Sequence, residues 1–445
     1  MESRYQCKDQ RRSGSTAINI LRVQAGCILI LIAVYFLQAA TPLRLHPDTV
    51  VLFSIAETAE QGGGYLLHGE PTRFPPGYPM LLEFLMRMHA AHVWMIVALN
   101  VIFMVIGLSA AYSIFRSERF SRSSALGVCL LSLLSFVFIK YSAIPLTDTL
   151  FFGVSMCAVV LMKRLAAAFS WRMLTGALIL LIASLCVRRI GVALIPALPC
   201  ALGVQSSVRR YIAQLSPRKK ATLVLAAASF GGLMVWLVLA TSTLSDFSAV
   251  LVGHTLIESA RGVLAGHTLI ESVRGVLPFH LNELGEIAFN LPASALPAKV
   301  QTVLPVVGLS VCILAVVGAS RRKTIGVVET YLASYAAIIL AWPFYDPRFW
   351  LPVIPFLIAY TALALERVIK WKNGARIVKC YVMMFVLAGL VTMVSNTALS
   401  FSGPRFGDLY TGGYYHSTYC VVWHCSDLDS AKVDVDALHL LRTYK

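Results

Sequence analysis

Charged residues are scarce in this 445-residue sequence: they make up 13% of the chain, while 58% of its residues are hydrophobic. An ordinary soluble domain carries a charge on about a quarter of its residues. The composition therefore excludes a typical soluble globular protein and predicts an integral membrane protein. The ten cysteines are scattered, mostly within apolar stretches, so the sequence has neither a disulfide framework nor the spacing of a zinc site.

Several motifs that would indicate a reaction are also missing. The sequence has no Walker loop, no HExxH and no GxSxG. It has no chain of acids within the apolar stretches that would indicate a proton relay. We therefore predict no metal and no cofactor. The formal net charge of +16 suggests a nucleic-acid partner only until its distribution is considered, and we predict none.

Eleven apolar runs approach the length needed to cross a bilayer core of roughly 30 Å. Because backbone groups cannot stay unpaired in lipid, these runs must be helices. The runs lie at about 22–40, 93–114, 124–140, 149–162, 173–187, 190–204, 221–241, 303–318, 325–342, 350–366 and 380–397. The sequence thus predicts an all-α protein with about 11 transmembrane helices.

The basic residues set the predicted orientation, because cytoplasmic loops are enriched in Lys and Arg. With the N-terminus inside, every inside loop is basic, and these loops hold most of the 38 Lys and Arg residues but few of the 22 acids. The basic segment before the first run shows no convincing cleavage site and is interpreted as a retained signal anchor. We predict an N-in, C-out topology.

The long segments between runs then all fall outside. We predict a membrane domain over 1–397, with a first outside loop at 41–92 that carries amphipathic helices and a second at 242–302. An outside tail follows at 398–445, where Cys420 and Cys425 stand in a setting that permits a disulfide. In the second loop GHTLIESARGVLA is followed by GHTLIESVRGVL, which we interpret as a local duplication within an amphipathic surface helix.

The first outside loop is unusually acidic for so apolar a chain. Asp48 follows His46 and Pro47 shortly after the first apolar run, and Glu57 lies farther along the same stretch. Asp48 is either a solvated loop residue or a general base that takes a proton from an acceptor. The PPGYP segment ends the loop as a rigid corner, where Tyr78 is a candidate for lining a site.

Four further residues combine charge with an apolar setting. Asp148, in IPLTDTLFF, is either a helix cap or a site residue close to the surface that carries Asp48. Arg188 and Arg189, in CVRRIGVAL, either extend to the interface or bind a phosphate through their planar guanidinium groups. Arg348, in DPRFWLPVIPF, has the same two interpretations, and Asp346 offers it a neutralising partner.

Together these motifs resemble those of the glycosyltransferase C superfamily, multi-span enzymes that use polyprenyl-phosphate sugars. The resemblance rests on HPD, FPPGYP, IPLTDTLFF, RRIGVAL and DPRFWLPVIPF, in that order, over about residues 20–370. PPGYP and the R-x-x-LP-x-x-P pattern resemble bacterial members of the dolichyl-phosphate-mannose:protein mannosyltransferase type, and HPD resembles mannosyltransferases of lipid-linked oligosaccharide and anchor assembly. Such families often carry two adjacent acids in the first loop, whereas Asp48 is followed by Thr49.

The resemblance implies an inverting transfer of mannose or a similar sugar to a lipid, glycan or protein acceptor. Asp48 would be the catalytic base, and His46, Glu57, Tyr78, Asp148, Arg188, Arg189 and Arg348 would bind substrates. The expected setting is a bacterial inner membrane, among membrane lipids, with the site facing the periplasm. A multi-span lipid or sugar transporter (a flippase) and an O-antigen polymerase or ligase are the alternatives. A carrier is expected to show related halves and broken helices near mid-membrane, which the sequence does not indicate.

Overall fold

The structure is a computed structural model that describes residues 2–72, 74–203, 269–321, 326–342, 344–370, 373–410, 414–425 and 428–444. In these residues the chain forms helices and one two-stranded antiparallel hairpin, in which Leu66 lies opposite Pro71. The structure agrees with the predicted all-α architecture with several helices able to span a membrane. The predicted helix at about 221–241 and the first copy of the duplication lie outside the described residues.

The elements follow one another along the chain with these bounds: α1 (Glu2–Leu37), η1 (Gln38–Ala40), α2 (Pro47–Glu60), β1 (Leu66–Leu67), β2 (Glu70–Pro71), α3 (Gly77–Arg87), α4 (Val93–Ser117), α5 (Arg122–Leu133), α6 (Phe136–Ser142), α7 (Thr147–Ala167), α8 (Trp171–Val187), η2 (Arg189–Leu194), α9 (Ala197–Gly203), α14 (Leu269–Phe289), η3 (Ala293–Ala295), α15 (Ala298–Gln301), α16 (Leu304–Ser320), α17 (Val327–Leu340), η4 (Pro347–Val353), α18 (Ile354–Val368), α19 (Gly374–Ser400), η5 (Gly403–Arg405), α20 (Phe406–Leu409), α21 (His416–Trp423), η6 (Ser430–Lys432) and α22 (Val435–Thr443).

Within the described residues, 6 helical segments are long and apolar enough to cross a membrane. They are Asn19–Ala40, Val93–Ser117, Thr147–Ala167, Ala298–Ser320, Pro347–Glu366 and Gly374–Ser400. A seventh span arises if α5 and α6, which meet at a bend of 56°, are counted together. Three further predicted runs correspond to the shorter apolar helices Trp171–Val187, Arg189–Gly203 and Val327–Leu340. Every predicted run in the described residues is therefore helical, while the total of 11 spans stays a prediction.

Small residues let the long helices approach one another closely, as is usual where lipid supplies no hydrophobic drive between helices. On α7, a Cβ at Gly153 would lie 2.8 Å from the Phe103 carbonyl oxygen of α4. On α16, a Cβ at Gly308 would overlap the Leu281 carbonyl oxygen of α14. These contacts fix α4 against α7 and α14 against α16, the two most extensively packed helix pairs among the described residues.

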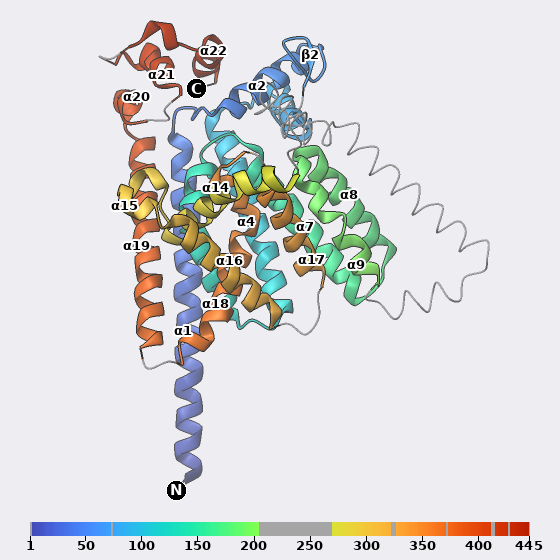
Figure 1. The fold of residues 1–445 in the computed structure, drawn as a ribbon, viewed down its shortest axis with the longest axis vertical. Helices are drawn as coiled ribbons and strands as arrows, with labels where there is room; N and C mark the ends of the chain where they lie inside the picture. The colour runs from blue at the N-terminus through green and yellow to red at the C-terminus, as the bar shows by residue number, and fades with distance from the viewer. Residues whose placement is uncertain are drawn as a thin grey trace, which may run out of the picture.

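The first loop and the C-terminal tail lie at the same end of the helix bundle, and the N-terminus lies at the other (Figure 1). This arrangement agrees with placing both segments on one side of the membrane, although the orientation itself remains a prediction. Of the second predicted outside segment, 269–302 is described, and it forms α14, η3 and α15. Part of α14 is deeply buried, because His280 and Glu283 are 0% and 3% exposed, so it is not simply a surface helix.

The tail is fastened to the first loop by specific hydrogen bonds. The Tyr419 hydroxyl donates to the Leu43 carbonyl at 2.8 Å and accepts from the Leu45 N–H at 2.7 Å. At the far end of α2, the Tyr444 hydroxyl donates to Glu57 at 2.9 Å. Within the tail a disulfide joins Cys420 and Cys425, one of the two states that the sequence left open.

Candidate functional site

Asp48 is placed by the start of α2. His46 caps this helix, accepting the Asp48 N–H on its Nδ1 atom at 3.2 Å, and Pro47 occupies the first helical position. A missing N–H and a fixed φ suit proline to that position, so the sequence HPD directly encodes the helix start. The Asp48 side chain consequently stands in the first turn, where the helix dipole favours a negative charge, and remains 31% exposed.

Asp148 stands in the corresponding place on α7. It lies in the first turn of that helix and is fully buried. The residue before the helix, Leu146, makes no side-chain cap, and the Asp148 carboxylate is engaged by arginines instead. The contacts of Asp148 are thus ion pairs with arginines and not a helix cap, and its role in a site stays a prediction.

Arg348 joins the two aspartates. Its Nη2 atom donates to the Asp48 carboxylate, and its Nη1 lies 3.8 Å from an Asp148 oxygen. Its Nε lies 3.2 Å from Asp346, which also caps η4 by accepting the Arg348 N–H at 3.0 Å. The side chain is only 8% exposed, so this guanidinium group is held inside the protein by three carboxylates.

Arg188 completes the cluster from the end of α8. It forms an ion pair with Asp148 through Nη1. Its guanidinium carbon lies 5.2 Å from the ring centroid of Phe349 and 6.0 Å from that of Phe151. Arg188 therefore turns inward to a buried acid and two aromatic faces.

The charges of this cluster are unevenly matched, because three carboxylates face two guanidinium groups. Burial raises the pKa of Asp48, but Arg348 and His46 lower it by more, so the carboxyl stays ionised below its ordinary pKa. Burial lowers the pKa of His46, and Arg348 lowers it further against the opposing effect of Asp48. His46 is therefore mainly neutral at pH 7, and in formal charge the three carboxylates outnumber the two guanidinium groups by one.

The remaining candidates occupy different surroundings. Tyr78 is buried beside the end of α8, where a Cβ on neighbouring Gly77 would lie 2.7 Å from the Cys186 carbonyl oxygen. Its hydroxyl has no hydrogen-bond partner among the described residues, and burial together with Asp148 raises its pKa. Arg189 is half-buried at the start of η2. Glu57 faces the tail, with His439 Nε2 at 3.1 Å, and is not part of the aspartate–arginine cluster.

Sequence reasoning missed the residues that hold Asp346 and the η4 segment in place. The Tyr141 hydroxyl donates to Asp346 at 2.6 Å. Glu283 accepts the Trp350 indole N–H at 2.7 Å and pairs with His280 at 2.9 Å, which fixes η4 from the α14 side. In the sequence these residues give only weak signals, because Tyr141 bonds to Asp346 and Glu283 to Trp350, partners more than sixty residues away.

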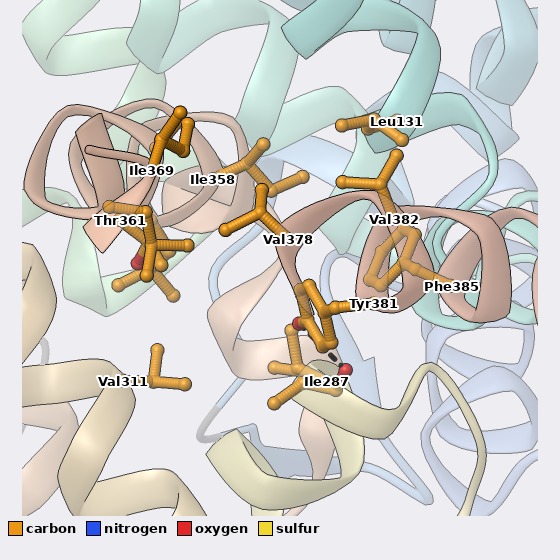
Figure 2. A pocket seen from close by; sticks show the side chains of 14 residues that line it. Leu131, Ile287, Val311, Ile358, Thr361, Ile369, Val378, Tyr381, Val382 and Phe385 are labelled. Carbon is orange, nitrogen blue, oxygen red and sulfur yellow. Dashed lines mark hydrogen bonds between the residues drawn. The ribbon is translucent and has the colours of Figure 1, made fainter. Parts of the chain in front are cut away.

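An apolar cavity of about 150 Å³ lies elsewhere, between α14, α16, α18 and α19 (Figure 2). Aliphatic side chains dominate its lining, and Tyr381 donates its hydroxyl to the Ala288 carbonyl at 2.9 Å. It offers no acid or base to a reaction. In the described part of the chain no group of three or more His, Cys, Asp or Glu residues is arranged to hold a metal ion.

Comparison with known proteins gives one structural similarity. No protein-family model and no curated protein sequence matches the chain. The fold is similar to that of the archaeal oligosaccharyltransferase AglB from Archaeoglobus fulgidus, solved with an inhibitory peptide and a dolichol-phosphate. The TM-score is 0.43 and the identity 14%, over 91% of this chain and 60% of that chain. Similarity at this level assigns no residue, donor or acceptor to the present chain.

Proposed function

We propose that the protein is an inverting glycosyltransferase that moves a sugar, mannose or one like it, from a polyprenyl-phosphate donor to an acceptor at the outer face of the membrane. The observation that carries the proposal is the pairing of Asp48 with Arg348. It provides a carboxylate that is ionised, partly exposed and held at the end of a membrane helix bundle. An ionised carboxylate that solvent and substrate can reach is able to take a proton from an acceptor as a general base.

The proposed step needs few groups. Asp48 takes the proton of the attacking acceptor group as the acceptor atom bonds to the anomeric carbon. The bond between that carbon and the donor phosphate oxygen breaks on the opposite face, which inverts the configuration. The phosphate leaves as an anion and requires cationic stabilisation, not a proton.

The arginines are the groups that could stabilise the leaving phosphate. Arg188 makes its described ion pair through Nη1 alone, which leaves further N–H groups for a phosphate. Planar guanidinium groups bind phosphate in a bidentate manner. Asp148 would then act by holding Arg188 and Arg348 in place, and the unpartnered hydroxyl of Tyr78 is available to a substrate oxygen.

The test is a transfer assay with the purified protein and a panel of polyprenyl-phosphate sugars, following loss of the donor. Asp48→Asn keeps the shape of the side chain but cannot accept the proton, so turnover should fall by about 10²–10⁴ while donor binding persists. Glu60→Gln, an exposed carboxylate on the same helix, is the matched control and should keep normal turnover.

Near-normal turnover in Asp48→Asn would remove Asp48 from the chemistry. If Asp48→Asn and Asp148→Asn both keep function while the protein builds a substrate gradient across vesicles, the protein is a transporter. Loss of donor consumption together with loss of donor binding would point to a structural role for Asp48.

A further inference from the structure

A second cavity is lined in part by segments that neighbour the candidate site. Its volume is about 580 Å³, and it is bounded by α6, the connection from α14 to α15, and the outer part of α19. Two cations, Arg44 and Lys140, line it together with the polar side chains of Thr392, Ser395 and Asn396. Most of the remaining lining residues are apolar, Phe136 and Leu399 among them. The cavity therefore combines positive charge with apolar walls.

Arg44 is a buried cation without an acidic partner. Its side chain is 2% exposed, and its hydrogen bonds go to Thr41, Asn396 and Ser400, all of them neutral. No carboxylate within the described residues forms an ion pair with it. Burial lowers the pKa of Arg44 to about 10, so the group remains charged at neutral pH. A buried charge is costly unless it is paired, and an unneutralised guanidinium group at a cavity wall is a site for an anion.

Lys140 adds a second positive charge to the same cavity. It is exposed, and its described contact is with the Tyr141 ring, 5.0 Å from the centroid. Lys140 interacts electrostatically with Glu286. Burial raises the pKa of Glu286 to about 7, against the lowering effect of a backbone hydrogen bond and of Lys140. At pH 7 Glu286 is thus only partly ionised, and the cavity retains a net positive charge.

We propose that this cavity binds the phosphate group of an anionic membrane lipid. Arg44 and Lys140 supply the charge, and the Ser395 hydroxyl supplies a neutral hydrogen-bonding group. The Thr392 hydroxyl and the Asn396 amide donate to the Ala388 and Ile139 carbonyls and shape the wall. The apolar wall along α19, a helix long and apolar enough to cross the membrane, accommodates the first part of a lipid chain. A lipid matches both the positive charge and the apolar walls of the cavity, whereas free phosphate would contact only the charged groups.

The cavity is distinct from the candidate site, although the two share segments. Arg44 precedes Asp48 by four residues, and Lys140 is adjacent to Tyr141, whose hydroxyl bonds to Asp346. The two places have opposite formal charge, since the carboxylates of the aspartate–arginine cluster outnumber its guanidinium groups. The proposal therefore stands independently of the glycosyltransferase assignment, and it is tested by binding alone.

The experiment measures lipid-dependent stabilisation of the full chain, purified in a neutral detergent. A ligand that binds only the folded state raises the unfolding temperature in a concentration-dependent manner. Short-chain phosphatidylglycerol should raise this temperature saturably, and zwitterionic phosphatidylcholine should need at least about tenfold more lipid for the same shift. Inorganic phosphate alone should produce no saturable shift in the same range.

Lys140→Gln is the decisive variant, because Lys140 is exposed and its loss should not disturb folding. We expect its apparent affinity for phosphatidylglycerol to fall by about tenfold or more. Lys370→Gln, also an exposed lysine but outside the cavity lining, should keep the wild-type affinity. Arg44→Lys keeps the charge but loses the fork that holds Asn396 and Ser400, and should weaken binding if it folds.

Three outcomes would overturn the proposal. The first is an unchanged affinity in Lys140→Gln. The second is equal stabilisation by phosphatidylglycerol and phosphatidylcholine. The third is saturation by inorganic phosphate at the concentrations that suffice for the lipid, which would make the cavity a free-phosphate site.

Discussion

Arg348 contacts three carboxylates that lie far apart in the sequence, and its position decides the charge state of the site. Its pairing with Asp48 offsets the cost of burying that carboxylate, and its contacts with Asp148 and Asp346 connect α7 to η4. Removing one member of such a buried network leaves the others with uncompensated charge, which is far more costly than removing a surface ion pair. The proposed chemistry should therefore be most sensitive to mutation of Arg348 and its carboxylate partners.

Replacing Arg348 by Gln should shift the pH dependence of the reaction. In the native protein the pKa of Asp48 lies below its ordinary value of 3.8, so the base is lost only as the pH falls below that value. Without Arg348, burial dominates, the pKa rises, and the acidic limb of the pH profile of kcat/KM should move to higher pH. Arg348→Lys keeps the charge and should shift the limb less. An unmoved acidic limb in Arg348→Gln would contradict Asp48 as the base.

Replacing Arg188 by Lys should raise the KM for the donor. The substitution keeps the charge that faces Asp148 but loses the planar group that lies beside the Phe349 ring. A planar guanidinium group is also the better partner of a phosphate. Arg172→Lys, an exposed arginine at the other end of α8, is the control and should leave KM unchanged. Steady-state kinetics over a range of donor concentrations gives the KM of both variants.

At the scale of elements, the apolar runs predicted the helices well, because hydrophobic length is a local property of the chain. The sequence also placed Asp48, Asp148, Arg188 and Arg348 in one functional group, from their motifs. It could not predict which arginine meets which aspartate, since those pairs depend on how α2, α7, α8 and η4 pack. For the same reason it could not predict that Glu57 contacts His439 and Tyr444 of the tail.

The tail is an element whose contribution should be measurable through Tyr419. This fully buried hydroxyl bonds to the backbone at Leu43 and Leu45, directly before the segment that carries Asp48. Tyr419→Phe leaves two backbone groups without their partner and should lower the free energy of unfolding by about 1–3 kcal/mol. Turnover should fall as well, because the start of α2 is less firmly held.

Thermal unfolding followed by circular dichroism gives the change in stability. Tyr414→Phe is the control, because Tyr414 is 74% exposed. Equal stability of the Tyr419→Phe variant and the native protein would show that the tail does not anchor the first loop.

At the scale of the whole molecule, the first loop and the C-terminal tail gather at one end of the bundle, and the basic N-terminal helix extends from the other (Figure 1). The positive-inside rule assigns that N-terminal end to the cytoplasm. The bundle places these segments at opposite ends, as an N-in, C-out topology requires, and the charge distribution supplies the predicted direction.

This topology predicts which positions react with an impermeant maleimide added to intact cells. With the free cysteines replaced, a cysteine at Gln61 in the first loop should be labelled, and one at Ser320 at the end of α16 should not. Both positions are exposed in the structure, so a difference between them reports the membrane and not burial. Labelling of Ser320→Cys from outside would invert the topology and place the candidate site on the cytoplasmic face.

The hydrogen bond between Tyr419 and Leu43 also has a consequence for biosynthesis, because it joins residues 376 positions apart. A ribosome that adds about 5–20 residues per second needs roughly 20–75 s to cover that distance. During this interval the segment before Asp48 has already been made, while the residue that fixes it has not. Completion of the site is therefore set by translation of the last segment, and a nascent chain arrested before Tyr419 should present the first loop in an unfastened form.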